Sequence, residues 1–143
     1  MHFHTEVTVK FYQIDAGGVL FYGNLFTMAH DAFESFLKAL SIEWSSWFQN
    51  PEWGMPIRRT EAEYLKPMIG GETYRVEIQV QKLGETSFTL GYRFLKGDVL
   101  YATSLTSHVF IELMERSMAP LRVKGSRSIP DSVRDCLSTY KAE

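Results

Sequence analysis

The chain has 143 residues, of which 45% are hydrophobic and 14% aromatic, and this composition fits one globular domain over residues 1–143. Its 15 Lys and Arg residues nearly balance its 17 Asp and Glu residues, which argues against nucleic-acid binding because that function needs a basic face. The single cysteine excludes an internal disulfide framework. No apolar run approaches the ~18 residues of a membrane span, and the start MHFHTEV does not resemble a signal peptide. We therefore expect a cytoplasmic protein.

The N-terminal third predicts a strand followed by a long helix. Side chains alternate between apolar and polar over residues 3–11, which is the pattern of a strand with one buried side. From residue 24 the apolar positions recur every three or four residues, which predicts an amphipathic helix of roughly 17 residues, 24–40. Asn24 has the side chain of an N-cap.

A second, shorter helix is predicted within residues 42–54, where Asn50-Pro51 ends the helical pattern. This stretch is rich in aromatic residues, which we expect to lie in the core: Trp44, Trp47, Phe48 and Trp53.

Four more strands are predicted over residues 57–65, 73–82, 86–96 and 99–112. The short turns KLGE and KGD are hairpin signals, so the last three strands should pair antiparallel. After Pro120 the chain turns polar and predicts a weak helix near residues 131–141. The most economical packing is an α+β fold in which the long helix crosses one face of a curved antiparallel sheet.

The stretch FYQIDAGGVLFYGN places one carboxylate, Asp15, ahead of two glycines at the threshold of the long helix. An aspartate beside glycine often does no more than close a turn. It is also the type of residue that serves as a general base or nucleophile, although no partner for it is visible locally. The local sequence leaves both interpretations open.

The segment IDAGGVLFYGNLF, in front of a long amphipathic helix, resembles the active-site segment of the hotdog-fold thioesterases, most closely the 4-hydroxybenzoyl-CoA thioesterase and YbgC-like types. The strand order and the segments EAEYLKPMIGGE and LGETSF match as well, so the resemblance covers about residues 4–118. It implies a five-stranded antiparallel sheet wrapped around one long helix, with residues 120–143 as a polar C-terminal segment. It also implies an acyl-CoA thioesterase that needs no metal and no redox cofactor.

The same resemblance implies roles for three residues of the loop. In the family the matching aspartate attacks the thioester or activates water, which assigns that role to Asp15. The backbone N–H of Tyr22 would hold the carbonyl oxygen, and Gly18 would shape the turn between them. Helix N-termini suit such a task because they present unpaired N–H groups and a partial positive charge. Many relatives have a second aspartate where this chain has Gln13, which leaves the hydrogen bonding around Asp15 open.

The segment AHDAFE contains His30 and Glu34, which share a helix face and suggest either a metal pair or a polar helix edge. A metal would need further ligands that the sequence does not offer. HDAFE resembles the HE-x-W-E variant of the 1,4-dihydroxy-2-naphthoyl-CoA thioesterases. This resemblance suggests an aromatic acyl group, with His30 or Asp31 near the acyl pocket.

Other candidate binding residues lie farther along the chain. By resemblance, Thr86 and Ser87 would line the partner subunit's side of the site, although both also fit an ordinary strand. Arg58, Arg59 and Lys66 have the charge to meet the CoA phosphates, and equally they fit the solvated face of an edge strand. No phosphate-binding glycine loop and no GxSxG elbow is present, and Cys136 has no visible base that would activate it.

The family also implies an oligomer, a homodimer or a homotetramer, in which two sheets join at the edge that a five-stranded sheet leaves unpaired. Alternative functions are a YbgC-like thioesterase for short aliphatic acyl-CoA and a non-catalytic thioester-binding module. A hotdog dehydratase is a weaker alternative, because it would carry a catalytic histidine where this chain has Asp15.

Overall fold

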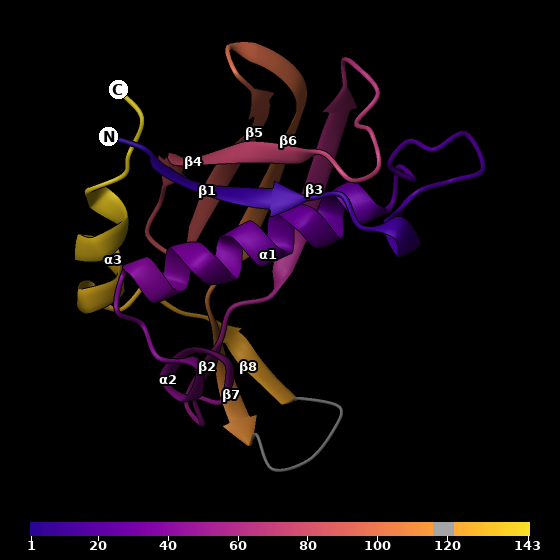
Figure 1. Ribbon diagram of the computed structural model, residues 1–143. Coiled ribbons are helices and arrows are strands. Elements are labelled where there is room, and N and C mark those ends of the chain that lie inside the picture. The colour runs from indigo at the N-terminus through magenta and orange to yellow at the C-terminus, as the bar shows by residue number, and fades with distance from the viewer. Residues whose placement is uncertain (116–121) are drawn as a thin grey trace.

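The computed structural model describes residues 1–115 and 122–143 (Figure 1). The predicted boundary between the core and the C-terminal segment, near residues 118–120, lies outside these residues. No described helix is long and apolar enough to cross a membrane. The elements in chain order are β1 (Phe3–Thr8), a 3-10 helix (Phe11–Gln13), α1 (Asn24–Ala39), α2 (Trp44–Phe48), β2 (Trp53–Gly54), β3 (Ile57–Tyr64), β4 (Thr73–Leu83), β5 (Ser87–Lys96), β6 (Val99–Val109), β7 (Ile111–Glu115), β8 (Arg122–Ser126) and α3 (Asp131–Ser138).

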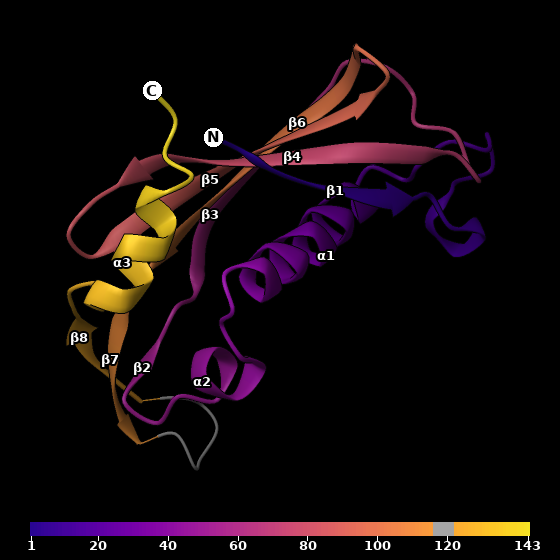
Figure 2. The same ribbon diagram turned by 60° about the vertical axis from the view of Figure 1, so that its left-hand side comes forward.

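The main sheet has five antiparallel strands in the order β1-β4-β5-β6-β3, and β4, β5 and β6 are joined by the two predicted hairpins. Helix α1 lies across one face of this sheet, which curves over it (Figures 1 and 2). The predicted α+β architecture is therefore confirmed.

The core forms where the apolar stripe of α1 meets alternate residues of the central strands. Every second side chain of β4 and β5 is buried there, as the period of two predicts. Each large side chain removed from water contributes about 1.5–3 kcal/mol. The buried residues of this interface are Leu25, Met28, Ala29, Ala32, Phe33, Phe36, Leu37, Tyr74, Val76, Ile78, Val80, Phe88, Leu90, Tyr92 and Phe94.

Two local predictions at the N-terminal end are wrong. The first strand ends at Thr8, and Phe11, predicted to face the core, is 89% exposed in the 3-10 helix. The amide oxygen of Gln13 accepts from the Lys10 N–H (2.9 Å), which closes this turn instead of extending the strand. The N-cap of α1 is Gly23, because the Asn24 side chain donates to the Gln13 carbonyl and does not cap its own helix.

The predicted strand over residues 99–112 is in fact two strands, β6 and β7, separated at Phe110. The Phe110 N–H donates to the Thr86 carbonyl (2.8 Å), and the chain then leaves the main sheet. Strand β7 pairs with β2 and β8 in a second, three-stranded sheet that the sequence analysis missed.

The second sheet and α2 form a lobe at the bottom of Figure 1. Trp47 and Trp53 are buried there against Phe110, with ring centroids 6.1 and 5.0 Å from it, so the prediction that they lie in the core is confirmed. The same prediction for Trp44 and Phe48 falls on side chains outside the described part of the structure.

Candidate active site

The loop between the 3-10 helix and α1 folds back on itself and presents Asp15. The Asp15 N–H donates to the Val19 carbonyl (2.8 Å), and the Phe21 N–H donates to the Gln13 carbonyl (2.9 Å). The Gly18 N–H closes the tip on the Asp15 carbonyl (3.1 Å). These backbone bonds fix the position of Asp15 without using the hydrogen-bonding capacity of its side chain.

The KPMIGGE segment supports this loop from the side. The Leu20 N–H donates to the Met68 carbonyl (2.7 Å), and the Gly70 N–H donates to the Gly18 carbonyl (3.0 Å). A Cβ at Gly70 would lie only 3.0 Å from the Ile14 side chain, so a larger residue here would require Ile14 to shift. Gly18 has φ +79°, a left-handed conformation that other residues rarely adopt, so its predicted place in the turn is matched by its geometry.

The Asp15 carboxylate is exposed, and one of its oxygens accepts the Gly17 N–H (2.8 Å). Among the described residues it forms no ion pair. An ionised carboxylate has about four acceptor sites, so most of the capacity of Asp15 is available to a water molecule or a substrate.

Tyr22 lies in the turn that leads into α1, one residue before the Gly23 cap. The Asn24 N–H donates to the Phe21 carbonyl (2.9 Å), and the Leu25 N–H donates to the Tyr22 carbonyl (3.3 Å). In the described part of the chain the Tyr22 N–H itself donates to no acceptor. An unpaired N–H at the positive end of a helix is suited to hold a developing oxyanion.

Three residues that hold this turn were missed as site residues. Besides the contacts of Gln13 and Asn24, the Tyr64 hydroxyl donates to the Tyr22 carbonyl. Local sequence offered a signal only for Asn24, whose polar side chain at a helix start was interpreted as a cap. Tyr64 is distant in the chain and belongs to β3, so no local pattern connects it to the loop.

His30 and Glu34 form an ion pair on α1 (3.6 Å), and within the described residues no three His, Cys, Asp or Glu side chains gather in a metal-binding arrangement. Asp31 and Glu34 border a groove of about 680 Å³ between α1 and α2, with Trp47 in its wall.

Four of the other predicted binding residues, Thr86, Ser87, Arg58 and Arg59, lie far from Asp15 in a single chain, whereas Lys66 borders a hollow beside the loop together with Leu20. The Asp15 loop adjoins the start of β4, whereas Thr86 and Ser87 follow the end of β4, about 30 Å away at the usual rise of about 3.3 Å per strand residue. Arg58 and Arg59 belong to the start of β3, whereas the end of that strand contacts Tyr22 through Tyr64. The structure of one chain does not bring these residues together with Asp15.

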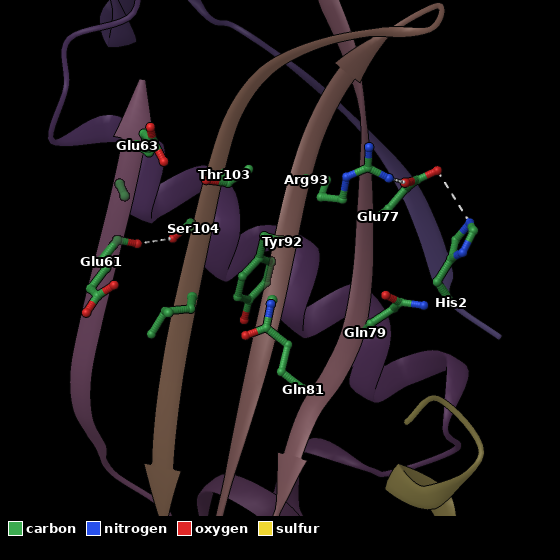
Figure 3. Close-up of a pocket in the computed structure, with 13 residues that line it drawn as sticks. His2, Glu61, Glu63, Glu77, Gln79, Gln81, Tyr92, Arg93, Thr103 and Ser104 are labelled. Atoms are coloured by element: carbon green, nitrogen blue, oxygen red, sulfur yellow. Dashed lines mark hydrogen bonds and ion pairs between the residues drawn. The ribbon is translucent and has the colours of Figure 1, made fainter. Parts of the chain in front are cut away.

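A separate hollow of about 650 Å³ lies on the other face of the sheet, with α1 behind the strands (Figure 3). At its side the Glu77 carboxylate is only 11% exposed and meets the side chains of Arg93 (2.9 Å), His2 (3.3 Å) and Arg75 (3.4 Å). Because this carboxylate is fully engaged, it has a structural role and does not offer a reactive group.

A curved antiparallel sheet around one long helix, with an exposed carboxylate in a glycine loop at the start of that helix, is the arrangement of a hotdog-fold thioesterase. The family model of the thioesterase-like superfamily matches residues 9–136, and the chain belongs to this superfamily. It is a thioester hydrolase with the hotdog fold, as the sequence predicted.

Individual relatives agree with this assignment. The chain is 30% identical over 143 residues to a 1,4-dihydroxy-2-naphthoyl-CoA hydrolase from Nostoc punctiforme, covering 100% of this chain and 91% of that protein. The structure resembles a 1,4-dihydroxy-2-naphthoyl-CoA thioesterase from Synechocystis with a TM-score of 0.83, at 20% identity and 96% coverage of both chains. It also resembles a gentisyl-coenzyme A thioesterase with a TM-score of 0.78, at 23% identity, covering 94% and 98% of the two chains. The two structural matches show the fold alone.

Proposed function

We propose that the protein is an acyl-CoA thioesterase in which Asp15 is the nucleophile or general base and the Tyr22 N–H is the oxyanion donor. The observation that carries this proposal is the exposed Asp15 carboxylate, which the loop backbone positions ahead of α1 and which, among the described residues, accepts one hydrogen bond.

Two routes fit this geometry. As a general base, Asp15 takes a proton from water while the oxygen of that water attacks the thioester carbon, and CoA leaves as the thiol. As a nucleophile, Asp15 attacks the carbon itself, which expels CoA and forms a mixed anhydride that water then hydrolyses. In both routes the carbonyl oxygen becomes negative and accepts the Tyr22 N–H, an interaction worth about 2.7–4 kcal/mol for one donor. Neither route requires a metal or a redox cofactor.

An aromatic acyl group is the preferred substrate class in this proposal. The Nostoc relative is named for a dihydroxynaphthoyl ester and one structural neighbour for a gentisyl ester, and both acyl groups are hydroxylated aromatic rings. The HDAFE segment, with His30 and Asp31 exposed on α1, supports the same class. A short aliphatic acyl-CoA is the alternative.

We further propose that the working form is a homodimer joined through β3, with a homotetramer as the alternative. Strand β3 is an edge strand whose residues are nearly all exposed. Symmetric antiparallel pairing with a second copy would set Arg58 of one copy opposite Glu63 of the other. It would also bring the distant ends of the two strands together, so that the second copy supplies Thr86, Ser87 and Arg59 near the Asp15 loop. Sedimentation should give a dimer mass or a multiple of it, and a stable monomer would contradict this part of the proposal.

The function itself is tested by thiol release from a panel of CoA esters: short aliphatic, long aliphatic, benzoyl, 4-hydroxybenzoyl and dihydroxynaphthoyl. We expect an aryl ester to be the best substrate, and Asp15→Asn to lower its turnover by at least about 10²-fold. His30→Ala should alter selectivity among the acyl groups if this side chain borders the acyl pocket. Saturable binding of an ester without thiol release would instead indicate a non-catalytic binding module.

A further inference from the structure

We propose that Tyr64 is a positioning residue for this reaction, because its hydroxyl holds the carbonyl of the residue whose N–H serves as the oxyanion donor. This inference rests on the proposed role of Tyr22. Tyr64 does not touch the substrate in this proposal. It acts through the backbone of the turn between the catalytic loop and α1.

The direction of the Tyr22 N–H follows from the peptide on its N-terminal side. The Phe21 carbonyl accepts the Asn24 N–H (2.9 Å), so it points along the start of the helix. In a planar trans peptide the N–H points opposite to the carbonyl. The Tyr22 N–H is therefore directed out of the helix start, where a thioester carbonyl can approach it.

The next peptide needs its own support, because the Tyr22 carbonyl has only a long bond from the Leu25 N–H (3.3 Å) within the turn. The Tyr64 hydroxyl supplies a second donor to this carbonyl. Gln13 anchors the turn on the other side, since its carbonyl accepts both the Phe21 N–H and the Asn24 side chain, each at 2.9 Å. Removal of the Tyr64 hydroxyl would leave the Tyr22 carbonyl with the long Leu25 bond alone, so the peptide between Tyr22 and Gly23 would be held less firmly.

Tyr64 also connects the turn to a rigid element. It ends β3 and pairs with Ala102 of β6 in the main sheet. Desolvation, and to a lesser degree the neighbouring Tyr22 phenol, raises the pKa of Tyr64, so its hydroxyl stays protonated. A carbonyl can only accept, and a protonated phenol is the donor that it requires. Its ring borders a hollow of about 250 Å³ beside the loop, together with Leu20 and Lys66.

The test replaces Tyr64 by Phe, which keeps the ring and removes the hydroxyl. We expect kcat for 4-hydroxybenzoyl-CoA to fall about 10-fold, with KM and thermal stability nearly unchanged, because a misdirected donor loses part of the 10²–10³-fold that a whole donor contributes. The matched control is Tyr12→Phe. Tyr12 lies near the same loop and is 79% exposed, and its hydroxyl has no bond within the described residues. This control should retain full turnover.

A second readout separates positioning from structural support. In the Asp15→Asn background the bound ester is consumed at least about 10²-fold more slowly, so the infrared stretch of its thioester carbonyl can be recorded. The band should lie below that of the free ester, and adding Tyr64→Phe should move it back toward the free value. An unchanged kcat, or a loss of kcat and stability together with an unmoved band, would overturn the inference alone. Full turnover by Asp15→Asn would overturn the proposed function, and this inference with it.

Discussion

Two carboxylates of this protein have opposite surroundings. Asp15 is exposed at the tip of a loop and accepts one backbone N–H, whereas Glu77 is nearly buried on an open sheet face between two arginines and a histidine. The backbone holds the first loop in place, and the side chains on the sheet face hold one another (Figure 3). A carboxylate with unused hydrogen-bonding capacity can bind a water molecule or a substrate, whereas a saturated carboxylate has nothing to offer either.

The same carboxyl-to-amide change at Asp15 and at Glu77 tests whether the two carboxylates have different roles. Asp15→Asn should lower turnover by at least about 10²-fold without loss of stability. Glu77→Gln should lower the free energy of unfolding by about 1–2 kcal/mol, because its partners are themselves partly exposed, and should leave turnover unchanged. Thiol release and thermal unfolding of the two variants check this, and an exchange of the two effects would refute the distinction.

A third polar group, His108, is fully buried, and its effect on stability can be tested by a pH series. Burial, together with the nearby charge of His30, lowers the pKa of His108 from 6.5 to about 3. Its Nε2 meets the Thr106 hydroxyl (2.7 Å), its ring stacks on Phe88, and within the described residues its Nδ1 has no partner. The unfolded chain therefore binds a proton below pH 6.5 that the folded chain does not bind.

The stability that His108 contributes should be complete above about pH 6.5 and should be lost as the pH falls toward 3, by up to about 1.4 kcal/mol per pH unit. Denaturant unfolding at several pH values measures this slope. His108→Gln should flatten it over the same range, because the amide does not titrate. Equal slopes in the two proteins would show that His108 is not the source.

The smallest expected effects are those of alanine substitutions at two glycines with left-handed backbones, Gly18 and Gly97. Gly18 in the Asp15 loop and Gly97 in the β5–β6 turn have φ +79° and +61°, and in both cases no atom lies within 4 Å of where a Cβ would be. Alanine at either position should cost about 1–2 kcal/mol of stability from the left-handed backbone alone. Only Gly18→Ala should also reduce turnover, by a few-fold, and equal turnover in the two variants would show that the loop tolerates the shift.

Periodicity predicted much of the fold because burial on one side of a helix or a strand is a local property of the sequence. The stripe of α1 and the alternation of β4 and β5 follow from it directly. The break at Phe110 was missed because it depends on a hydrogen bond to Thr86, a residue of the turn between β4 and β5 that is distant in the chain. The alternation of residues 3–11 continued past the true strand end because hydrophobicity alone does not register the capping amide of Gln13.

The candidate site divides in the same way. Asp15 and the two glycines after it lie in one short segment, and its composition predicts a tight turn. The hold of Tyr64 on the Tyr22 carbonyl is a tertiary contact between a loop and a sheet edge, and no local pattern encodes it. The prediction by resemblance that Thr86 lines the partner subunit's side of the site concerns a second chain, and the prediction that Arg58 meets the CoA phosphates concerns a ligand, so no local pattern encodes either contact.

The aromatic lobe below the main sheet has a consequence for following the unfolding of this protein. All three tryptophans lie within residues 44–53, in α2 and β2, and Trp47 and Trp53 pack on Phe110 where the chain leaves the main sheet. Intrinsic tryptophan fluorescence therefore reports on this lobe, whereas far-ultraviolet circular dichroism is dominated by the main sheet and α1. Coincident transitions from the two signals would show that lobe and sheet melt as one cooperative unit, and separate transitions would reveal two.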